Sequence, residues 1–534
     1  MKIQNRWLGL VVIAMAISIV IIDGTIVNTI FPAIITDLSL TSTEVQWVQE
    51  SYVLVFAALL LIWGSLGDQI GRRKLLIIGV TIFIISSVWA GQTETASEMI
   101  MARVVQGIGG SMVLPTTLSL VNANFQGKER GTAFAIWGAT IGGMVAIGPV
   151  LGGWLATDFS WRWAFLINLP LGILILIGLW LTVPESKAAV RSRIDIVGAA
   201  LSVVLFSTLV FALIEGRVYG WLTPNPNNPF ELFGWAWPTD SISVVPVALL
   251  VSLLTAVVFV RWELGRAKKG KGVLLDLGLF RISSFRNGSI AALIISMGEF
   301  GLLFAIPLWL QNVLALSPIS AGLVLLWLAG GAFLAAGVSG ALAGKLPPAK
   351  AVQLGVLLEL IAVAGVGLFA TIGTGWLPLA PLLLIYGIGV GLATAQLTGV
   401  IMKDVPEDMS GQGSGSQSTV RQIGSALGIA VLGTMLFSGT QASLETRLDA
   451  LEVDAQSQVL IVDSVVGSAG GAILGLDQAF AEPLGAEKAE AVKFAAEEAF
   501  TDGAKLSAWA AAGFLLLGFF STFRLGSRKV TKTT

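Results

Sequence analysis

The sequence contains no cysteine and no histidine, and only 12% of its 534 residues are charged. The missing cysteines exclude a disulfide framework and any thiolate metal site. The missing histidines remove the side chain that most often transfers protons near neutral pH, so carboxylates must do that work. No nucleophile–base arrangement and no metal-ligand cluster is visible, and we therefore expect no enzyme activity, no metal and no cofactor.

Hydrophobic residues are abundant instead, at 55% of the chain, which is more than the core of a soluble protein of this length requires. The chain is therefore expected to sit in a lipid bilayer. The net charge is only −1, and the basic residues gather in short loops rather than on one face, so we expect no nucleic-acid partner. The first apolar run is longer than a signal-peptide core, and we predict that it is retained.

A helix needs roughly 20 apolar residues to cross a bilayer. Fourteen stretches meet this requirement, near residues 8–31, 47–67, 74–92, 98–121, 134–157, 163–183, 195–215, 242–263, 287–313, 319–343, 350–373, 378–402, 411–437 and 505–524. The sequence thus predicts an all-α integral membrane protein. Because the number of crossings is even, both termini lie on the same side.

The distribution of basic residues predicts which side that is. If the termini are cytoplasmic, the cytoplasmic segments hold 24 of the 32 Lys and Arg residues, whereas the short loops opposite hold only Arg162 and Arg217. Cytoplasmic loops of membrane proteins carry such an excess of positive charge. We predict a multi-pass monomer of the inner (cytoplasmic) membrane with both termini in the cytoplasm.

One long segment, about 438–504, carries twelve Asp or Glu residues and is predicted to be an extracellular loop. Its apolar stretch 459–476 contains Asp463 and four glycines, and we do not expect it to cross the membrane. In 486–500, apolar residues at helical spacing (Ala489, Val492, Ala496 and Phe500) favour a helical cap over the outer mouth. A tolerated insertion without function is an equally good interpretation.

Seven ionisable residues lie inside or at the rim of the apolar stretches: Asp23, Glu50, Arg103, Glu215, Glu299, Glu359 and Arg421. A charge in the hydrocarbon costs several kcal/mol unless a partner or a water-filled cavity receives it, so such residues mark sites where something charged moves.

Counting along the helices gives each of these residues a depth. Asp23 and Arg103 fall at similar depths, and we predict that they meet, as a structural ion pair or as a pair that protonation loosens. Glu299 and Glu359 fall near the bilayer centre and, with Asp23, are the predicted proton carriers. Glu50 lies near the outer rim, where a solvated helix end and a substrate contact are equally good interpretations.

The two remaining charges receive simpler interpretations. Glu215 is expected to end its helix on the outer side without a functional role. Arg421 is expected to neutralise one of the acids or to stabilise a neighbouring helix end.

Two glycine-containing segments suit conformational change. The turn after the second stretch places Asp68 beside three bases, with Gly64, Gly71, Arg72 and Arg73 as its other notable members. Asp68 can hold a cationic group or a helix end in one conformation and release it in another, although a positively charged stop signal explains the charges equally well. In 138–153, small residues at every fourth position permit close helix packing, and Pro149, flanked by Gly148, Gly152 and Gly153, bends the helix.

These segments resemble motifs of the major facilitator superfamily. Residues 64–74 resemble its G-x-L-a-D-r-x-G-r-r signature, the segment Arg103-Val-Val-Gln106-Gly107 is similar to its helix 4 motif, and 148–153 resemble the antiporter motif of its drug exporters. Other segments, including 23–32 and 161–172, narrow the resemblance to the fourteen-helix drug:proton antiporters. The resemblance covers about 8–437 and the last helix, and leaves the acidic segment without support.

The resemblance implies two six-helix bundles, residues 1–183 and 287–534, with 184–286 forming a linker that holds two inserted helices. It implies a role for Arg103 in proton transfer and a substrate contact for Glu50. The expected activity is efflux of amphiphilic, cationic drugs in exchange for protons, which compete with the drug for Asp23, Glu299 and Glu50. Rival interpretations are proton-linked export of a neutral amphiphile or lipid, and a transporter-derived sensor or scaffold.

Overall fold

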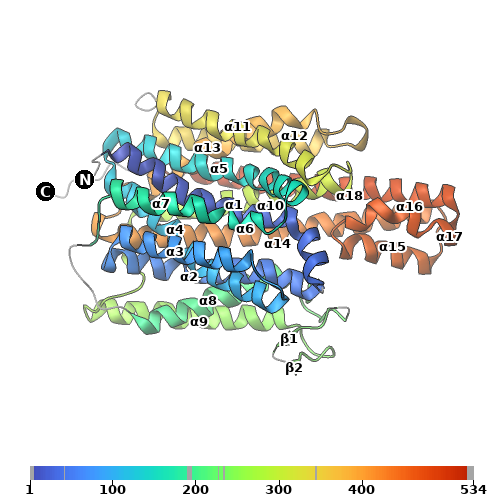
Figure 1. Ribbon diagram of the computed structural model, residues 1–534, viewed down its shortest axis with the longest axis horizontal. Helices are drawn as coiled ribbons and strands as arrows, with labels where there is room; N and C mark the ends of the chain where they lie inside the picture. Colours follow the sequence, from blue (N-terminus) through green and yellow to red (C-terminus); the bar gives the residue numbers. More distant parts are fainter. Residues whose placement is uncertain are drawn as a thin grey trace.

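The computed structural model describes residues 5–40, 42–188, 195–226, 228–232, 235–342 and 346–525. Long helices run side by side along the longest axis of the molecule (Figure 1). Fourteen helices of the described residues are long and apolar enough to cross a membrane, which confirms the number predicted from the sequence. The only strands described form a two-residue hairpin outside the bundle, so the fold is all-α in its membrane part.

The first bundle contains six membrane-crossing segments, of which the sixth is divided at Ile167 into α6 and α7. Its helices are α1 (Arg6–Leu38), α2 (Ser42–Ile70), α3 (Arg72–Ala90), α4 (Ala96–Asn124), α5 (Gly127–Asp158), α6 (Trp163–Leu166) and α7 (Asn168–Thr182). Side-chain caps start several of them. Thr95, for example, accepts a hydrogen bond from the backbone N–H of Glu98 at the start of α4.

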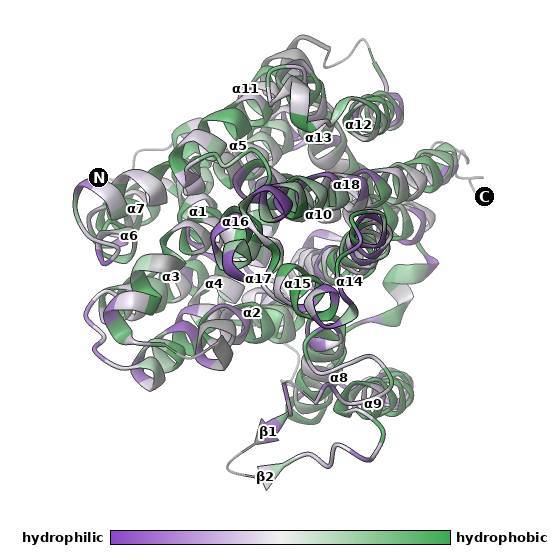
Figure 2. Ribbon diagram, turned by 90° about the vertical axis from the view of Figure 1, so that its right-hand side faces the viewer, coloured by the Kyte–Doolittle hydropathy of each residue, from purple (hydrophilic) through white to green (hydrophobic). Residues whose placement is uncertain are grey.

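Two helices, α8 (Ile196–Glu215) and α9 (Val244–Lys268), follow the first bundle and pack against each other. Between them lies the hairpin of β1 (Glu231–Leu232) and β2 (Trp235–Ala236). Figure 2 shows this pair at the edge of the molecule, where α8 contacts α2 and α14. Much of α9 is apolar and exposed, as lipid contact requires.

The second bundle also contains six membrane-crossing helices. They are α10 (Ser283–Asn312), α11 (Pro318–Leu342), α12 (Pro348–Phe369), α13 (Leu379–Met402), α14 (Ser410–Ala450) and α18 (Ala486–Thr522). Short 3-10 turns join or follow them at η1 (Leu277–Arg281), η2 (Ile372–Thr374), η3 (Glu407–Met409), η4 (Gly471–Gly475) and η5 (Phe523–Leu525). The bundles meet where α5 packs along α11 and α13, and where α2 packs along α14.

The segment 438–504 differs from the predicted loop. α14 continues to Ala450 and α18 begins at Ala486, so about half of the segment consists of two helix extensions that leave the bundle. The predicted helix in 486–500 is confirmed, and its apolar residues Ala489, Val492, Ala496 and Phe500 are all fully buried. The predicted absence of a fifteenth crossing in 459–476 is also confirmed, since α15 (Ala455–Gly467) has only 13 residues.

The extensions and three short helices form a compact projection, which we call the cap (residues 443–502). It includes α15, α16 (Leu476–Ala479) and α17 (Ala481–Leu484) (Figure 1). Arg447 of α14 forms ion pairs with Glu498 and Asp502 of α18. Lys493 donates a hydrogen bond of 3.2 Å to Asp477, which holds the pKa of that carboxyl below its usual value. Ion pairs therefore join the two helix extensions.

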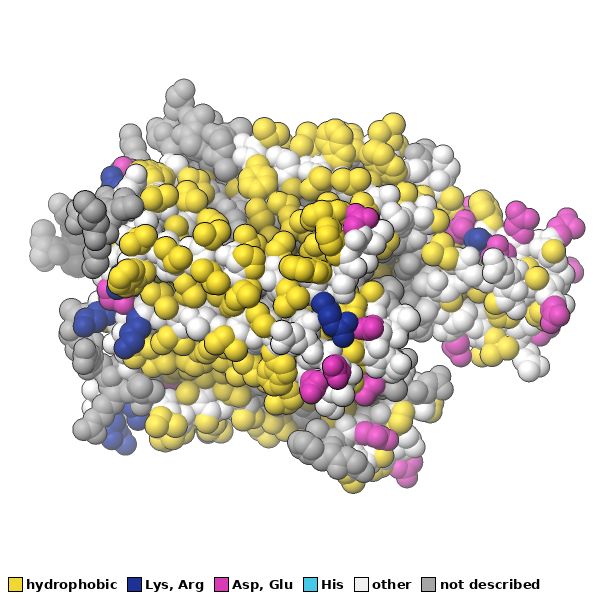
Figure 3. Space-filling view, viewed as in Figure 1, with side chains coloured by type: hydrophobic (Ala, Val, Ile, Leu, Met, Phe, Trp, Pro, Cys, Tyr) yellow, Lys and Arg dark blue, Asp and Glu magenta, His cyan; other side chains and the backbone are white. Residues whose placement is uncertain are grey.

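The charged side chains separate along the long axis. In Figure 3 an apolar belt covers the middle of the visible face, most Lys and Arg side chains lie at one end, and the cap at the other end is rich in Asp and Glu. We call these the basic end, where Arg72, Arg73 and Lys74 lie, and the cap end. The belt has the surface expected of a multi-pass membrane protein.

Candidate functional site

A buried ion pair joins α1 and α4 in the first bundle. Arg103 Nη1 lies 2.6 Å from Asp23 Oδ2, which confirms the predicted meeting of the two residues. Gln106 Nε2 donates to the other carboxylate oxygen of Asp23 at 2.7 Å, and Arg103 Nε donates to the carbonyl of Val48 at 3.2 Å. The ring of Tyr52 lies 4.2 Å from the guanidinium carbon. Both carboxylate oxygens are thus hydrogen-bonded, and Asp23 is only 1% exposed.

A second acid and arginine meet in the other bundle, with weaker contacts. Arg421 of α14 lies 3.3 Å from Glu299 Oε2 on α10, and Thr394 of α13 donates to Glu299 Oε1 at 3.4 Å. Of the two interpretations of Arg421, this contact favours neutralisation of an acid, and the role itself stays a prediction. Tyr386 donates to the backbone carbonyl of Glu299 at 3.0 Å and not to its carboxylate. Both contacts to the carboxylate are long for charge-assisted hydrogen bonds.

Glu359 of α12 lies beside this pair and lacks contacts of its own. It is fully buried, and neither carboxylate oxygen has a hydrogen-bond partner among the described residues. Glu299 and Arg421 are the charged groups that act on it. An ionised carboxylate without a partner is very unfavourable in an apolar interior, so Glu359 is suited to hold a proton.

A small cavity of about 30 Å³, lined in part by Glu299 and Arg421, lies at the interface between the bundles. Gly138, Ile141, Gly142 and Val145 of α5 line one wall. The opposite wall comes from α10, α11, α13 and α14 and includes Glu299 and Arg421. The polar groups of the second bundle therefore face a helix of the first bundle, where relative movement of the bundles changes their surroundings.

Glu50 and Glu215 form a third acidic site. As predicted, Glu215 ends α8, and the structure adds that it is only 2% exposed and lies within hydrogen-bonding reach of the Glu50 carboxyl on α2. Counting residues along a helix gives depth but not the direction in which a side chain points, and α8 turns Glu215 toward α2. Glu50 is half-buried rather than a solvated helix end.

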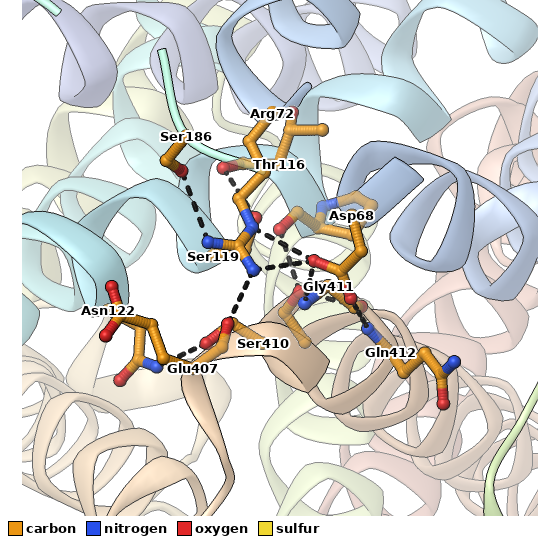
Figure 4. Close-up of polar contacts among 12 residues, drawn as sticks. Asp68, Arg72, Thr116, Ser119, Asn122, Ser186, Glu407, Ser410, Gly411 and Gln412 are labelled. Atoms are coloured by element: carbon orange, nitrogen blue, oxygen red, sulfur yellow. Dashed lines mark hydrogen bonds and ion pairs between the residues drawn. The ribbon is translucent and has the colours of Figure 1, made fainter. Parts of the chain in front are cut away.

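At the basic end, Asp68 joins the two bundles (Figure 4). Its carboxylate accepts hydrogen bonds from the backbone N–H groups of Gly411 (2.8 Å) and Gln412 (3.0 Å), at the start of α14. Arg72 donates to Asp68 at 2.7 Å and to the carbonyl of Glu407 at 2.7 Å. A carboxylate at a helix N-terminus is stabilised by the helix dipole and by the free N–H groups there. We call this arrangement the latch.

The chain after α7 completes the latch. Ser186 accepts from Arg72 through its hydroxyl at 3.2 Å, and Glu185 accepts from the backbone N–H groups of Arg73 (3.0 Å) and Lys74 (3.1 Å). Gly71 adopts a φ of +116°, which favours glycine, and it leaves room for the Glu185 carboxylate. Glu185 therefore caps the first turn of α3.

Gly64 lets α2 and α14 touch through their backbones. A Cβ built on Gly64 would lie 2.7 Å from the Cα of Gly415, too close for any real contact. Any side chain at position 64 would therefore push the two helices apart.

The glycines around Pro149 serve two different helix contacts. Gly148 and Gly152 face α1, where a Cβ on Gly152 would lie 2.9 Å from the carbonyl oxygen of Ile26. Gly153 faces α11, where a Cβ would lie 3.2 Å from the backbone nitrogen of Ile319. This turn of α5 is thus wedged between the first helix of one bundle and the second helix of the other.

Comparison with known proteins identifies the family. The sequence profile of the Major Facilitator Superfamily matches residues 13–429. The chain belongs to this superfamily. Among its relatives is the probable actinorhodin transporter of Streptomyces coelicolor, 33% identical over 82% of this chain and 74% of that protein. Multidrug resistance protein Stp of Mycobacterium tuberculosis is 28% identical over 99% of this chain and 93% of that protein.

Solved structures agree on the fold. The human organic anion transporter MFSD10 (TETRAN) superimposes with a TM-score of 0.59 at 13% identity, over 96% of this chain and 98% of that chain. The major facilitator fold predicted from the motifs is therefore confirmed. The Stp match, which spans almost the whole chain, includes the cap, for which the motifs had offered no support.

Sequence reasoning missed several contacts of this superfamily member. Glu185 and Ser186 of the latch, and Thr394 beside Glu299, lie on elements far away in the sequence. The sequence does hold one sign of the Glu185 contact. Glu185 is a lone acid that directly follows Val183 and Pro184, at the end of a helix.

Proposed function

We propose that the protein exports amphiphilic, cationic drugs from the cytoplasm in exchange for protons, by alternating access. The observation that carries this proposal is the acid pair of Glu299 and Glu359: Glu299 and Arg421 line a cavity between the bundles, and the buried, unpartnered Glu359 interacts with both of them. The multidrug resistance protein and the antibiotic transporter among the relatives support export of drug-like molecules.

The orientation in the membrane follows from the charges. The basic end faces the cytoplasm, because 24 of the 32 Lys and Arg residues belong to segments on that side. The cap then stands outside the cell. Residues 1–183 and 287–534 act as the two moving bundles, 184–286 link them, and a monomer suffices because the cavity is built within one chain.

The proposed exchange depends on one electrostatic condition. Arg421 balances one negative charge, so the second acid of the pair is stable only with a proton or with a cationic group of the drug. A proton and a drug cation therefore compete for the pair. Protons arriving from the outside displace the drug, and loss of protons to the cytoplasm restores the drug site. Asp23 and Arg103 form the corresponding proton-coupling pair of the first bundle, and Glu50 contacts the substrate.

The latch, with the wedged turn of α5, controls which side is open. With Asp68 bound to the start of α14, the cytoplasmic ends of α2 and α14 are held together. Opening toward the cytoplasm breaks these contacts and those of Arg72. Gly148, Pro149, Gly152 and Gly153 let α5 shift between α1 and α11 during the change.

Reconstitution tests the proposal directly. Proteoliposomes with an imposed pH gradient should accumulate ethidium, a monovalent hydrophobic cation, and the imposed gradient should collapse faster when ethidium is added. A divalent quaternary ammonium compound and a neutral amphiphile serve as comparison substrates. Gradient-driven transport of the neutral compound alone would contradict the cationic specificity, and no gradient-driven transport of any of them would contradict proton exchange.

A further inference from the structure

The carboxyl pair of Glu50 and Glu215 is separate from the acids Asp23, Glu299 and Glu359. Glu50 belongs to α2 of the first bundle, whereas Glu215 is the last residue of the inserted helix α8. The two carboxyl groups lie within hydrogen-bonding reach of each other. Two ionised carboxylates in such contact repel each other strongly, so the contact requires a proton or a cation between them.

Both acids have an unused hydrogen-bonding atom. Oε2 of Glu50 and Oε2 of Glu215 are buried and have no partner among the residues that the structure describes. Glu215 is only 2% exposed, which makes an unpartnered oxygen costly. Two unpartnered acceptors on neighbouring carboxyl groups suit a ligand that has hydrogen-bond donors or a positive charge.

One positive charge acts on this pair. Arg217 follows Glu215 by two residues and interacts with Glu50. Its guanidinium lies 4.1 Å from the ring centre of Phe437 on α14, so the side chain bridges the inserted helix and the second bundle. Among the described residues, the charged groups that act on the two acids are these acids themselves and Arg217.

The charges at this site add up in a simple way. With one proton on the pair, two carboxyl groups and Arg217 carry no net charge. Without that proton the site has a net charge of −1, which one monovalent cation restores to zero. Aromatic rings adjoin the site, since Phe437 lies under Arg217 and Tyr219 packs against Phe230 with ring centres 5.1 Å apart. Such rings suit the apolar part of an organic cation.

We infer that Glu50 and Glu215 together form an exchange site that holds either one proton or one amphiphilic monovalent cation, at the cap end between α2, α8 and α14. The inference rests on the proposed function and extends it, because it gives the inserted helices a binding residue. Glu215 binds the cation directly, and Glu50 needs Glu215 as its partner.

Binding measurements on the purified full-length protein test this inference. The probe is tetraphenylphosphonium, a monovalent hydrophobic cation, titrated between pH 6 and pH 8. If its binding releases a proton from the pair, the slope of log affinity against pH contains a contribution of about one from this site. Glu215→Gln should lower the slope by about one. Between pH 6 and pH 8, the affinity of the variant should therefore rise up to roughly 100-fold less than that of the wild type. Glu50→Gln should do the same, and the double variant should lose no more than either single variant.

Two controls keep the result interpretable. Glu231→Gln removes an exposed carboxylate in the neighbouring hairpin and should retain the wild-type slope. If Glu215→Gln does not give a monodisperse protein, Glu50→Gln reports on the same proton. An unchanged slope in either well-folded variant would overturn the inference. A failure of the proposed function would appear in a different experiment: wild-type proteoliposomes would then show no gradient-driven transport.

Discussion

The two bundles each hold an acid and an arginine within the membrane, and the two pairs differ in how well they are satisfied. Asp23 makes hydrogen bonds of 2.6 and 2.7 Å through both carboxylate oxygens, whereas the contacts to the Glu299 carboxylate are 3.3 and 3.4 Å long. Beside Glu299, Glu359 has no partner among the described residues. An acid and an arginine thus form a saturated ion pair in the first bundle, where short hydrogen bonds satisfy the carboxylate. In the second bundle they form an unsaturated pair, whose carboxylate has only long contacts.

This difference shows that buried charge alone does not identify a binding site. A saturated pair is stable as it stands and opposes change, because removing one partner leaves the other charge buried. An unsaturated pair can accept a proton or a ligand at little cost to the fold. The comparison therefore predicts that disturbing the pair costs more stability in the first bundle than in the second.

The largest expected effect is on stability in the first bundle. Arg103→Ala leaves Asp23 without its cationic partner and should lower the free energy of unfolding by about 3–5 kcal/mol. Thermal unfolding of the detergent-solubilised protein measures this loss. Arg421→Ala is the matched variant in the second bundle, and its loss should be clearly smaller because Arg421 is half-buried and its contact is long. Equal losses would refute the distinction between the two pairs.

The next effect is on transport in the second bundle. Glu359→Gln removes an acidic proton without adding a charge, so gradient-driven ethidium transport should fall at least tenfold while thermal stability stays close to wild type. Glu263→Gln, at a buried carboxyl of the inserted helix α9, controls for loss of any buried acid and should keep its transport rate. If Glu359→Gln transports ethidium at the wild-type rate, Glu359 is not part of the proton pathway.

A smaller effect is expected at the latch. Asp68→Asn removes the negative charge that holds the start of α14, and a loss of about 1.4 kcal/mol would shift the conformational equilibrium tenfold. Because the natural chain has no cysteine, a single cysteine at Ser119, near the latch, reports this shift through its rate of maleimide labelling. The rate should rise about tenfold.

Asp37 and Arg162 form an ion pair at the cap end and provide the control for the latch. Asp37→Asn removes a comparable charge from the opposite end of the first bundle. It should leave labelling at position 119 unchanged. A rise as large as that in Asp68→Asn would mean that labelling reports general loosening.

The smallest effect concerns helix contact. Gly64→Ala places a methyl group against the backbone of α14 and should reduce transport several-fold by weakening the closed latch. Gly67→Ala, one turn along the same helix, meets its nearest neighbouring atoms at an ordinary 3.5 Å and should behave as wild type. Similar transport rates for the two variants would show that the close approach at Gly64 is not required.

Much of the fold was predictable because the bilayer imposes length on each helix. Fourteen apolar stretches became fourteen candidate spans, and helical spacing with depth brought Asp23 to Arg103. Depth does not fix rotation about the helix axis. For that reason the sequence predicted that Glu215 ends its helix but not that it faces Glu50, and it did not predict that Glu359 lacks contacts.

The latch shows a related limit. Asp68 and its basic neighbours are recognisable as a group, but their partner is the N-terminus of α14, more than 340 residues away. The partner atoms are backbone N–H groups of Gly411 and Gln412, which any sequence would supply. Only the packing of α2 along α14 brings the two together.

A single uninterrupted helix connects three of these features. α14 runs through 41 residues, a length of about 60 Å, and carries Gly411 near its first turn, Arg421 within the membrane and Arg447 in the cap. A rigid rod of this kind cannot tilt at one end without swinging the other. In the proposed orientation, a movement of the cap outside the cell is therefore transmitted to the latch at the cytoplasmic end of α14, and we expect an antibody fragment bound to the cap to restrict the opening of the latch.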